Sequence, residues 1–246
     1  NPDFIRFFIG NNAQETGRHQ PPAEGRDVKI EEFFPFPQYE PKGLVGRDDV
    51  ALVKLATPVT DVDPMPLNLR SLTQYDVQAP IKYVGFGVDD GRRSTGSGIK
   101  RTITRPVSFI TDFTYLAENR DGGTCFGDSG GPGFLADGQG GYSLAGVVSA
   151  GTSTGGYSVD PCENGTGYYM RVDAFAWWIT EVTGIQFPSC EGTGQCYCEQ
   201  ACRVDGTCDN SKCKTMSCLE GLSCIALCEA GDNACANDCQ LLSLPG

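Results

Sequence analysis

The sequence predicts that most of the chain folds as an all-β protein, and three observations carry that prediction. Short runs rich in β-branched and aromatic residues recur, among them FIRFFIG, VKIEEFF, VALVKL, IKYVGFG, YSLAGVVSA and GYYMRV. Glycine, proline and polar residues separate these runs, and helical periodicity is rare. Many short strands at modest spacing are typical of a β-barrel or a β-sandwich. The 246 residues suffice to bury a core in one large domain or two smaller ones.

One helix is expected at the end of this β-rich part. In the stretch VDAFAWWITEVTGI, the apolar residues Phe175, Trp178, Ile179 and Val182 share one face at helical spacing. Gly184 stands where the helix should stop, because glycine readily adopts the left-handed conformation that ends many helices. The sequence therefore predicts a single helix that follows the strands.

The cysteines mark a domain boundary. Only Cys125 and Cys162 fall in the β-rich part, and the other eleven of the thirteen crowd into the C-terminal tail. The segment QFPSCEGTG before the tail has the composition of a linker. We therefore expect a β-rich domain over 1–187 and a small, disulfide-rich, partly helical domain over 188–246.

The charge of the chain excludes some classes of partner. The formal net charge is −12 and the pI is near 4.5, so we expect neither nucleic acid nor an anionic membrane surface as a partner. No apolar run approaches the roughly 20 residues of a membrane-spanning helix, and no signal peptide is visible at the start. The density of cysteines favours a secreted or cell-surface location.

Four motifs resemble the chymotrypsin/trypsin family of serine proteases. GDSGGP at Gly127–Pro132 is similar to the nucleophile loop of that family, and DDVALVKL at Asp48–Leu55 resembles the strand with the triad aspartate. YVGFG at Tyr83–Gly87 resembles a mid-domain strand, and GVVSAG at Gly146–Gly151 resembles the strand beside the specificity pocket. The motifs occur in the family's order and spacing. The resemblance implies a double antiparallel β-barrel of the trypsin-like type, with the first barrel incomplete and a C-terminal helix.

The resemblance also implies a chemistry for the GDSGGP loop. Ser129 would attack the scissile carbonyl, and the N–H groups of Gly127 and Ser129 would stabilise the oxyanion that forms. Asp49 would orient and charge-stabilise a histidine, and Ser149 would help to hold Asp49. Asp128 would form an activation ion pair with a new N-terminal amine. No cofactor and no metal ion are expected in such a site.

The base that Ser129 needs is not evident in the sequence. His19 is the sole histidine and lies in GRHQPPAEG, a polar loop with two prolines, while the FFIG of Phe7–Gly10 resembles a strand that follows the family's histidine. We therefore expect His19 to be an exposed loop residue rather than the base. Three accounts stay open: a fragment whose upstream segment carries the histidine, one chain of a two-chain form, or a degenerate protease. On this basis residues 1–246 alone are expected not to hydrolyse peptides.

A primary specificity pocket is implied by the same resemblance. Gly123 matches the floor of that pocket, Gly151 and Gly167 match its walls, and Cys125 and Cys162 match the disulfide that frames it. A deep pocket without a charge favours a sizeable apolar or aromatic side chain. Phe, Tyr, Leu or Met is therefore expected on the acyl side of the cleaved bond.

Two features near that pocket qualify this expectation. Asp160 and Glu163 lie near its mouth and could attract a basic residue instead. The segment Ser149–Gly151 is expected to pair with the substrate backbone as an edge strand.

Disulfides are the expected chemistry of the tail. It contains no Cys-x-x-Cys pair and no histidine, so a zinc ribbon is not expected. Two pairs of cysteines at helical spacing predict a helical hairpin stapled by Cys224–Cys239 and Cys228–Cys235. If the two cysteines of the β-rich part pair with each other, eleven remain in the tail. One of these must then be free, intermolecular or bonded to a part outside the chain.

Two functions are compatible with these features. The first is a secreted serine endopeptidase that cleaves protein or peptide substrates through an acyl-enzyme on Ser129. The alternative is a non-catalytic binding module with a protease fold, which meets a surface partner through its cysteine-rich tail. A histidine in the family motif upstream would support the enzyme, and its replacement would support the binding module.

Overall fold

The computed structural model describes the β-rich part of the chain and the helix that follows it. The described residues are 6–14, 24–40, 48–137, 140–153, 160, 162–185 and 187. The cysteine-rich segment 188–246 and its proposed hairpin lie outside the described residues. The boundary after residue 187 therefore stays a prediction.

The described chain forms nine strands, one short 3-10 helix and one α-helix. The strands are β1 (Arg6–Asn12), β2 (Glu24–Pro35), β3 (Ala51–Leu55), β4 (Pro80–Gly85), β5 (Arg101–Ile110), β6 (Thr114–Glu118), β7 (Pro132–Ala136), β8 (Tyr142–Ser153) and β9 (Gly165–Arg171). The helices are η2 (Gln74–Asp76) and α1 (Val172–Thr183). The chain divides into two units. The first comprises Asn1–Asn68 and Leu72–Val172 and holds all nine strands, and the second comprises Leu69–Ser71 and Asp173–Gly246.

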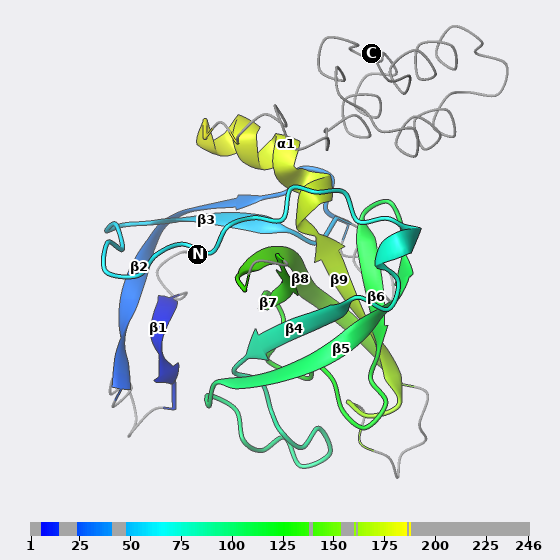
Figure 1. Cartoon of the computed structure of the whole chain (residues 1–246). Coiled ribbons are helices and arrows are strands. Elements are labelled where there is room, and N and C mark those ends of the chain that lie inside the picture. Colours follow the sequence, from blue (N-terminus) through cyan, green and yellow to red (C-terminus); the bar gives the residue numbers. More distant parts are fainter. Residues whose placement is uncertain are drawn as a thin grey trace, which may run out of the picture. The chain divides into compact units, whose positions relative to one another are not determined.

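The first three strands form an antiparallel sheet in the order β1-β2-β3 (Figure 1). One face of β2 is buried through Val28 and Ile30. Lys29, between them, is exposed, and beyond a register shift after Ile30 the exposed Phe33 of β2 pairs with the exposed Val53 of β3. The alternation from Val28 to Ile30 follows from the pleat, because successive side chains of a strand point to opposite faces.

The other six strands close into an antiparallel barrel in the order β4-β5-β6-β9-β8-β7 (Figure 1). Three tyrosines dominate its interior: the ring of Tyr169 stacks on Tyr83 at 4.4 Å and on Tyr115 at 5.1 Å between centroids. Aliphatic residues fill the rest of the interior. Gly133 and Gly146 make room for the stack, because a Cβ at either position would overlap Tyr115. The core therefore depends on large rings facing residues without side chains.

The helix ends as the sequence predicts. Gly184 has a φ of +70°, and its N–H donates to the carbonyl of Thr180 at 2.8 Å, which satisfies one of the last carbonyl groups of α1. The predicted all-β class, with an antiparallel barrel and a C-terminal helix, is confirmed. No helix among the described residues is long and apolar enough to cross a membrane.

Candidate active site

The GDSGGP loop at Gly127–Pro132 leads directly into β7. Ser129 is exposed, and Gly127 adopts a φ of +93°, which side chains other than glycine disfavour. The loop is tied to β8 at one residue: the N–H of Gly130 donates to the carbonyl of Val148 at 2.8 Å, and the N–H of Val148 donates to Gly131 at 2.9 Å. Val148 therefore holds the turn that presents the Ser129 hydroxyl.

The next residue of β8 holds the predicted triad aspartate. The Oγ of Ser149 donates a hydrogen bond to Oδ2 of Asp49 at 2.7 Å, although the two residues are 100 positions apart. Asp49 lies two residues before β3, at the edge of the three-stranded sheet. Because Val148 and Ser149 are adjacent, β8 brings the loop of Ser129 and the carboxylate of Asp49 to one stretch of strand.

Asp128 is held by the backbone of the chain itself. Its Oδ1 accepts from the N–H of Gly87 and its Oδ2 from the N–H of Cys125, both at 2.8 Å. The carboxylate fits closely against β4, since a Cβ on Gly85 would overlap it and one on Gly87 would lie 2.6 Å from its Oδ1. The carboxylate of Asp128 therefore occupies the space that the two glycines of the glycine-aromatic-glycine motif leave free.

Arg101, at the start of β5, organises the loop that follows β4. Its Nη1 donates to the carbonyls of Gly87 at 3.3 Å and Gly96 at 2.6 Å, and its Nη2 pairs with Asp89 at 2.9 Å. Gly87 thus accepts a hydrogen bond from Arg101 at its carbonyl and donates one to Asp128 from its N–H. Arg101 was not singled out by sequence reasoning, because nothing in its neighbourhood marks it.

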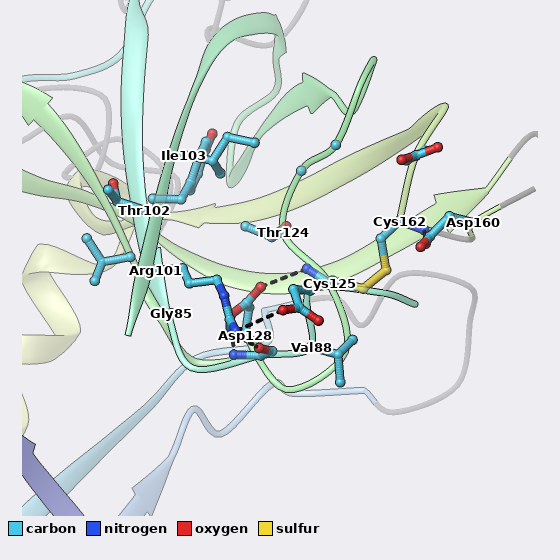
Figure 2. Close-up of a pocket in the computed structure, with 17 residues that line it drawn as sticks. Gly85, Val88, Arg101, Thr102, Ile103, Thr124, Cys125, Asp128, Asp160 and Cys162 are labelled. Carbon is cyan, nitrogen blue, oxygen red and sulfur yellow. Dashed lines mark hydrogen bonds and ion pairs between the residues drawn. A yellow bond between two sulfur atoms is a disulfide. The ribbon is translucent and has the colours of Figure 1, made fainter. Parts of the chain in front are cut away.

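A cavity of about 230 Å³ lies beside Asp128 (Figure 2). Its lining includes four carboxylates, from Asp89, Asp128, Asp160 and Glu163, and one guanidinium, from Arg101. The excess of negative charge makes this cavity suited to a cationic group rather than to an anion.

A disulfide joins Cys125 to Cys162 and closes one side of the cavity (Figure 2). Asp160 braces it: its Oδ1 accepts from the N–H of Cys162 at 2.9 Å and its Oδ2 from the N–H of Gly91 at 2.8 Å. The carboxylate of Asp160 therefore links two loops. It also lies near both sulfur atoms, but sulfurs joined in a disulfide are not the thiolates that bind metal ions.

The residues matched to the specificity pocket are distributed over two places. Gly151 of β8 faces Gly167 of β9 in register. A Cβ on Gly167 would overlap the hydroxyl of Tyr169, whereas the nearest atom to a Cβ on Gly151 is the carbonyl oxygen of Thr166 at 3.7 Å. Gly123 lines the acidic cavity, and neither Gly151 nor Gly167 is among the residues that line it.

Sequence reasoning missed Asn119, which lies next to Gly123. Its side chain is 3% exposed, and its carboxamide occupies the space that a Cβ on Gly123 would need. No sequence signal marks this contact, because it depends on a turn in which Asp121 and Gly122 both adopt positive φ angles. A neutral polar group therefore fills the position that the sequence suggested was empty.

His19 lies outside the described residues, so its assignment as an exposed loop residue stays a prediction. The described part of the chain supplies a candidate nucleophile, a candidate carboxylate and the candidate oxyanion amides. The base that would join Ser129 to Asp49 is not among the described residues, which include no histidine.

Comparisons with known proteins show which family this chain is similar to. A family model described as Trypsin matches residues 11–179. The Spaetzle-processing enzyme of Drosophila melanogaster is 29% identical over 175 residues, which cover 63% of this chain and 42% of that protein. Transmembrane protease serine 11E of Mus musculus is 48% identical over 178 residues, which cover 65% of this chain and 38% of that protein. The chain thus spans less than half the length of these curated relatives.

Proposed function

Because the chain belongs to the trypsin family, we propose that the protein is a serine endopeptidase whose nucleophile is Ser129. The observation that carries the proposal is the arrangement on β8. Val148 ties down the loop of Ser129, and the adjacent Ser149 donates its hydrogen bond to Asp49. Adjacent residues of β8 thus contact the loop of Ser129 and the carboxylate of Asp49, which supports a role for both groups on either side of a base.

The reaction would proceed by acyl transfer. The base takes the proton of the Ser129 hydroxyl as its Oγ attacks the scissile carbonyl, and then returns that proton to the leaving amine. The N–H groups of Gly127 and Ser129 would stabilise the negative oxygen of the tetrahedral intermediates. Water then attacks the acyl-enzyme, which releases the acid product and restores the hydroxyl. Asp49 would orient the base and stabilise its positive charge.

Asp128 is proposed as the residue that sets the oxyanion loop. Its carboxylate accepts hydrogen bonds from the amide of Cys125, just before that loop, and from the amide of Gly87, just after β4. It also lines the acidic cavity, which is where a positively charged amine would reach it. This arrangement supports the role of Asp128 in an activation ion pair.

The substrates are proposed to be proteins or peptides, encountered outside the cytoplasm. From Ala150 to Ser153, β8 pairs with β9 alone among the described strands. The other edge of this stretch is therefore placed to pair with an extended substrate backbone. Gly123, Gly151 and Gly167 would shape the pocket that receives the side chain before the cleaved bond, with Ser149 beside them.

The nucleophile is tested by labelling the full-length protein with a fluorophosphonate probe. We expect Ser129→Ala to abolish labelling and to lower kcat by several orders of magnitude, because the nucleophile is removed. His19→Ala is the matched control and should keep both, since His19 is not the proposed base. Labelling that persists in Ser129→Ala would refute the assignment, and a wild-type protein that is never labelled would favour the non-catalytic binding module.

A further inference from the structure

The residues on both sides of Gly127 bind two consecutive amides that follow β4. The N–H of Val88 donates to the carbonyl of Phe126 at 3.0 Å, and the N–H of Gly87 donates to Oδ1 of Asp128 at 2.8 Å. Gly127 itself lies against this backbone, since a Cβ on it would come within 3.2 Å of the Cα of Gly87. The two amides therefore hold the residue whose N–H is proposed to bind the oxyanion.

Each peptide group that carries one of these amides is also held at its carbonyl. A peptide group is planar, so its N–H and its C=O turn together. The group with the N–H of Gly87 has the carbonyl of Phe86, which accepts from the N–H of Gly98 at 2.7 Å. The group with the N–H of Val88 has the carbonyl of Gly87, which accepts from Nη1 of Arg101 at 3.3 Å. Backbone thus fixes the first group, and the side chain of Arg101 fixes the second.

Arg101 also closes the β4–β5 loop, defined as residues 86–100. Its Nη1 donates to the carbonyls of Gly96 at 2.6 Å and Ile99 at 3.2 Å, and its Nη2 pairs with Asp89 at 2.9 Å. The planar guanidinium suits this task because it offers several donors in a fixed arrangement. A single side chain therefore joins the start of the loop to its end.

The surroundings of Arg101 favour a positive charge. Asp89, Asp128, Asp160 and Glu163 line the same cavity as Arg101 (Figure 2). Asp89 forms the ion pair, with the side chain of Arg101 38% exposed, and opposite charges at this distance attract. The guanidinium is therefore held by charge as well as by the carbonyl groups of the loop.

We propose that Arg101 is a positioning residue that sets the amide of Gly127 for the oxyanion, through the peptide group of Gly87 and Val88. This role rests on the proposed function, in which the N–H of Gly127 stabilises the oxyanion. An oxyanion donor acts only at hydrogen-bond distance from the oxygen, and a misplacement of about 1 Å can cost about 100-fold in rate. Without the guanidinium, the carbonyl of Gly87 is released, and the amide that holds Phe126 turns with it.

The kinetic test separates kcat from KM in the full-length protein. Arg101→Met keeps an unbranched side chain and removes every donor. We expect kcat for a peptide substrate to fall about 10- to 100-fold and KM to change by less than about 2-fold, because the oxyanion exists only after attack. Arg93→Met makes the same exchange in the β4–β5 loop, at a side chain that is 80% exposed and paired with Asp90, and should leave both constants unchanged.

A pair of inhibitors distinguishes positioning from a loss of stability. With a peptide aldehyde, the Oγ of Ser129 adds to the aldehyde carbon, its proton passes to the base, and the carbonyl oxygen becomes an oxyanion. The matching peptide alcohol binds without forming an adduct. Arg101→Met should weaken inhibition by the aldehyde by about the factor by which kcat falls, and should leave inhibition by the alcohol unchanged. A protein that is only less stable would bind both inhibitors alike.

Three results would contradict the role of Arg101 and leave the endopeptidase intact. They are an unchanged kcat in Arg101→Met, a loss that falls on KM instead, and equal losses for the aldehyde and the alcohol. Absence of cleavage and of Ser129 labelling in the wild-type protein overturns both proposals.

Should Arg101→Met fail to fold, Arg101→Lys decides. Lysine keeps the charge opposite Asp89 but lacks the planar fork, so kcat alone should fall by about 3-fold or more. Wild-type kinetics in Arg101→Lys would then overturn the role.

Discussion

The six-stranded barrel and the three-stranded sheet use similar residues but bury them to different extents. In the barrel, Ile81 and Tyr115 are fully buried. In the sheet, Phe7, Phe33 and Val53 keep exposed fractions of 43%, 48% and 40%. A closed barrel gives each strand two hydrogen-bonded neighbours and seals its interior, whereas β1 and β3 each have one partner strand among the described elements.

The difference matters for the site because each part contributes to it. Ser129 belongs to a loop of the barrel, and Asp49 belongs to the edge of the sheet beside β3. The Ser149–Asp49 hydrogen bond joins the two. Since regions with few buried apolar contacts open more readily, we expect the position of Asp49 to be less stable than that of Ser129.

The largest expected effect is on the free energy of unfolding, and it comes from replacing one aromatic residue in the barrel and one in the sheet. Tyr115→Ala should lower the free energy of unfolding by about 3–5 kcal/mol, because it removes a fully buried ring from the tyrosine stack. Phe33→Ala, at a side chain that is 48% exposed, should cost about 1 kcal/mol or less. Urea unfolding of both variants measures the contrast. Equal losses would mean that the sheet buries its aromatic residues as the barrel does.

A second substitution tests how closely the barrel is packed. Gly146→Ala places a methyl group where it would overlap the ring of Tyr115 and should lower the free energy of unfolding by about 1–3 kcal/mol. Gly151→Ala, on the same strand, meets its nearest atom at 3.7 Å and should change it by about 0.5 kcal/mol or less. If Gly146→Ala is as stable as wild type in thermal and urea unfolding, the stack has room that the structure does not show.

Alkaline pH should destabilise the barrel through its buried tyrosines. Burial raises the pKa of Tyr83 and of Tyr169 above the usual value of about 10. The stability they contribute is fully present below about pH 10 and is lost as the pH rises above it, because the unfolded chain then releases protons that the barrel retains. The loss should reach up to about 1.4 kcal/mol per pH unit for each tyrosine.

The matched variant for this pH effect is Tyr83→Phe, which keeps the ring and removes the titrating hydroxyl. Urea unfolding between about pH 9 and about pH 11 should show a shallower loss of stability in this variant than in wild type. An identical pH dependence in the two proteins would show that Tyr83 ionises without unfolding the barrel.

The sequence by itself determined the features that depend on local pattern. Runs rich in β-branched and aromatic residues marked β1, β2, β3, β4, β8 and β9. Helical spacing and Gly184 marked α1, and GDSGGP marked the loop of Ser129. These signals are readable because strand pleat, helical period and glycine conformation act over a few residues. The motifs also implied the family, and with it the contact between Ser149 and Asp49.

Only the tertiary structure decided which groups meet around that loop. Asp128 takes the amide of Gly87, 41 residues away, and Arg101 holds the same residue from its carbonyl side. The side chain of Asn119 lies against Gly123 because the turn between them, with positive φ angles at Asp121 and Gly122, folds the chain back on itself. Such contacts depend on strand closure and on backbone angles that no residue pattern encodes, since hydrogen bonds and close packing are set by position in space rather than by order in the chain.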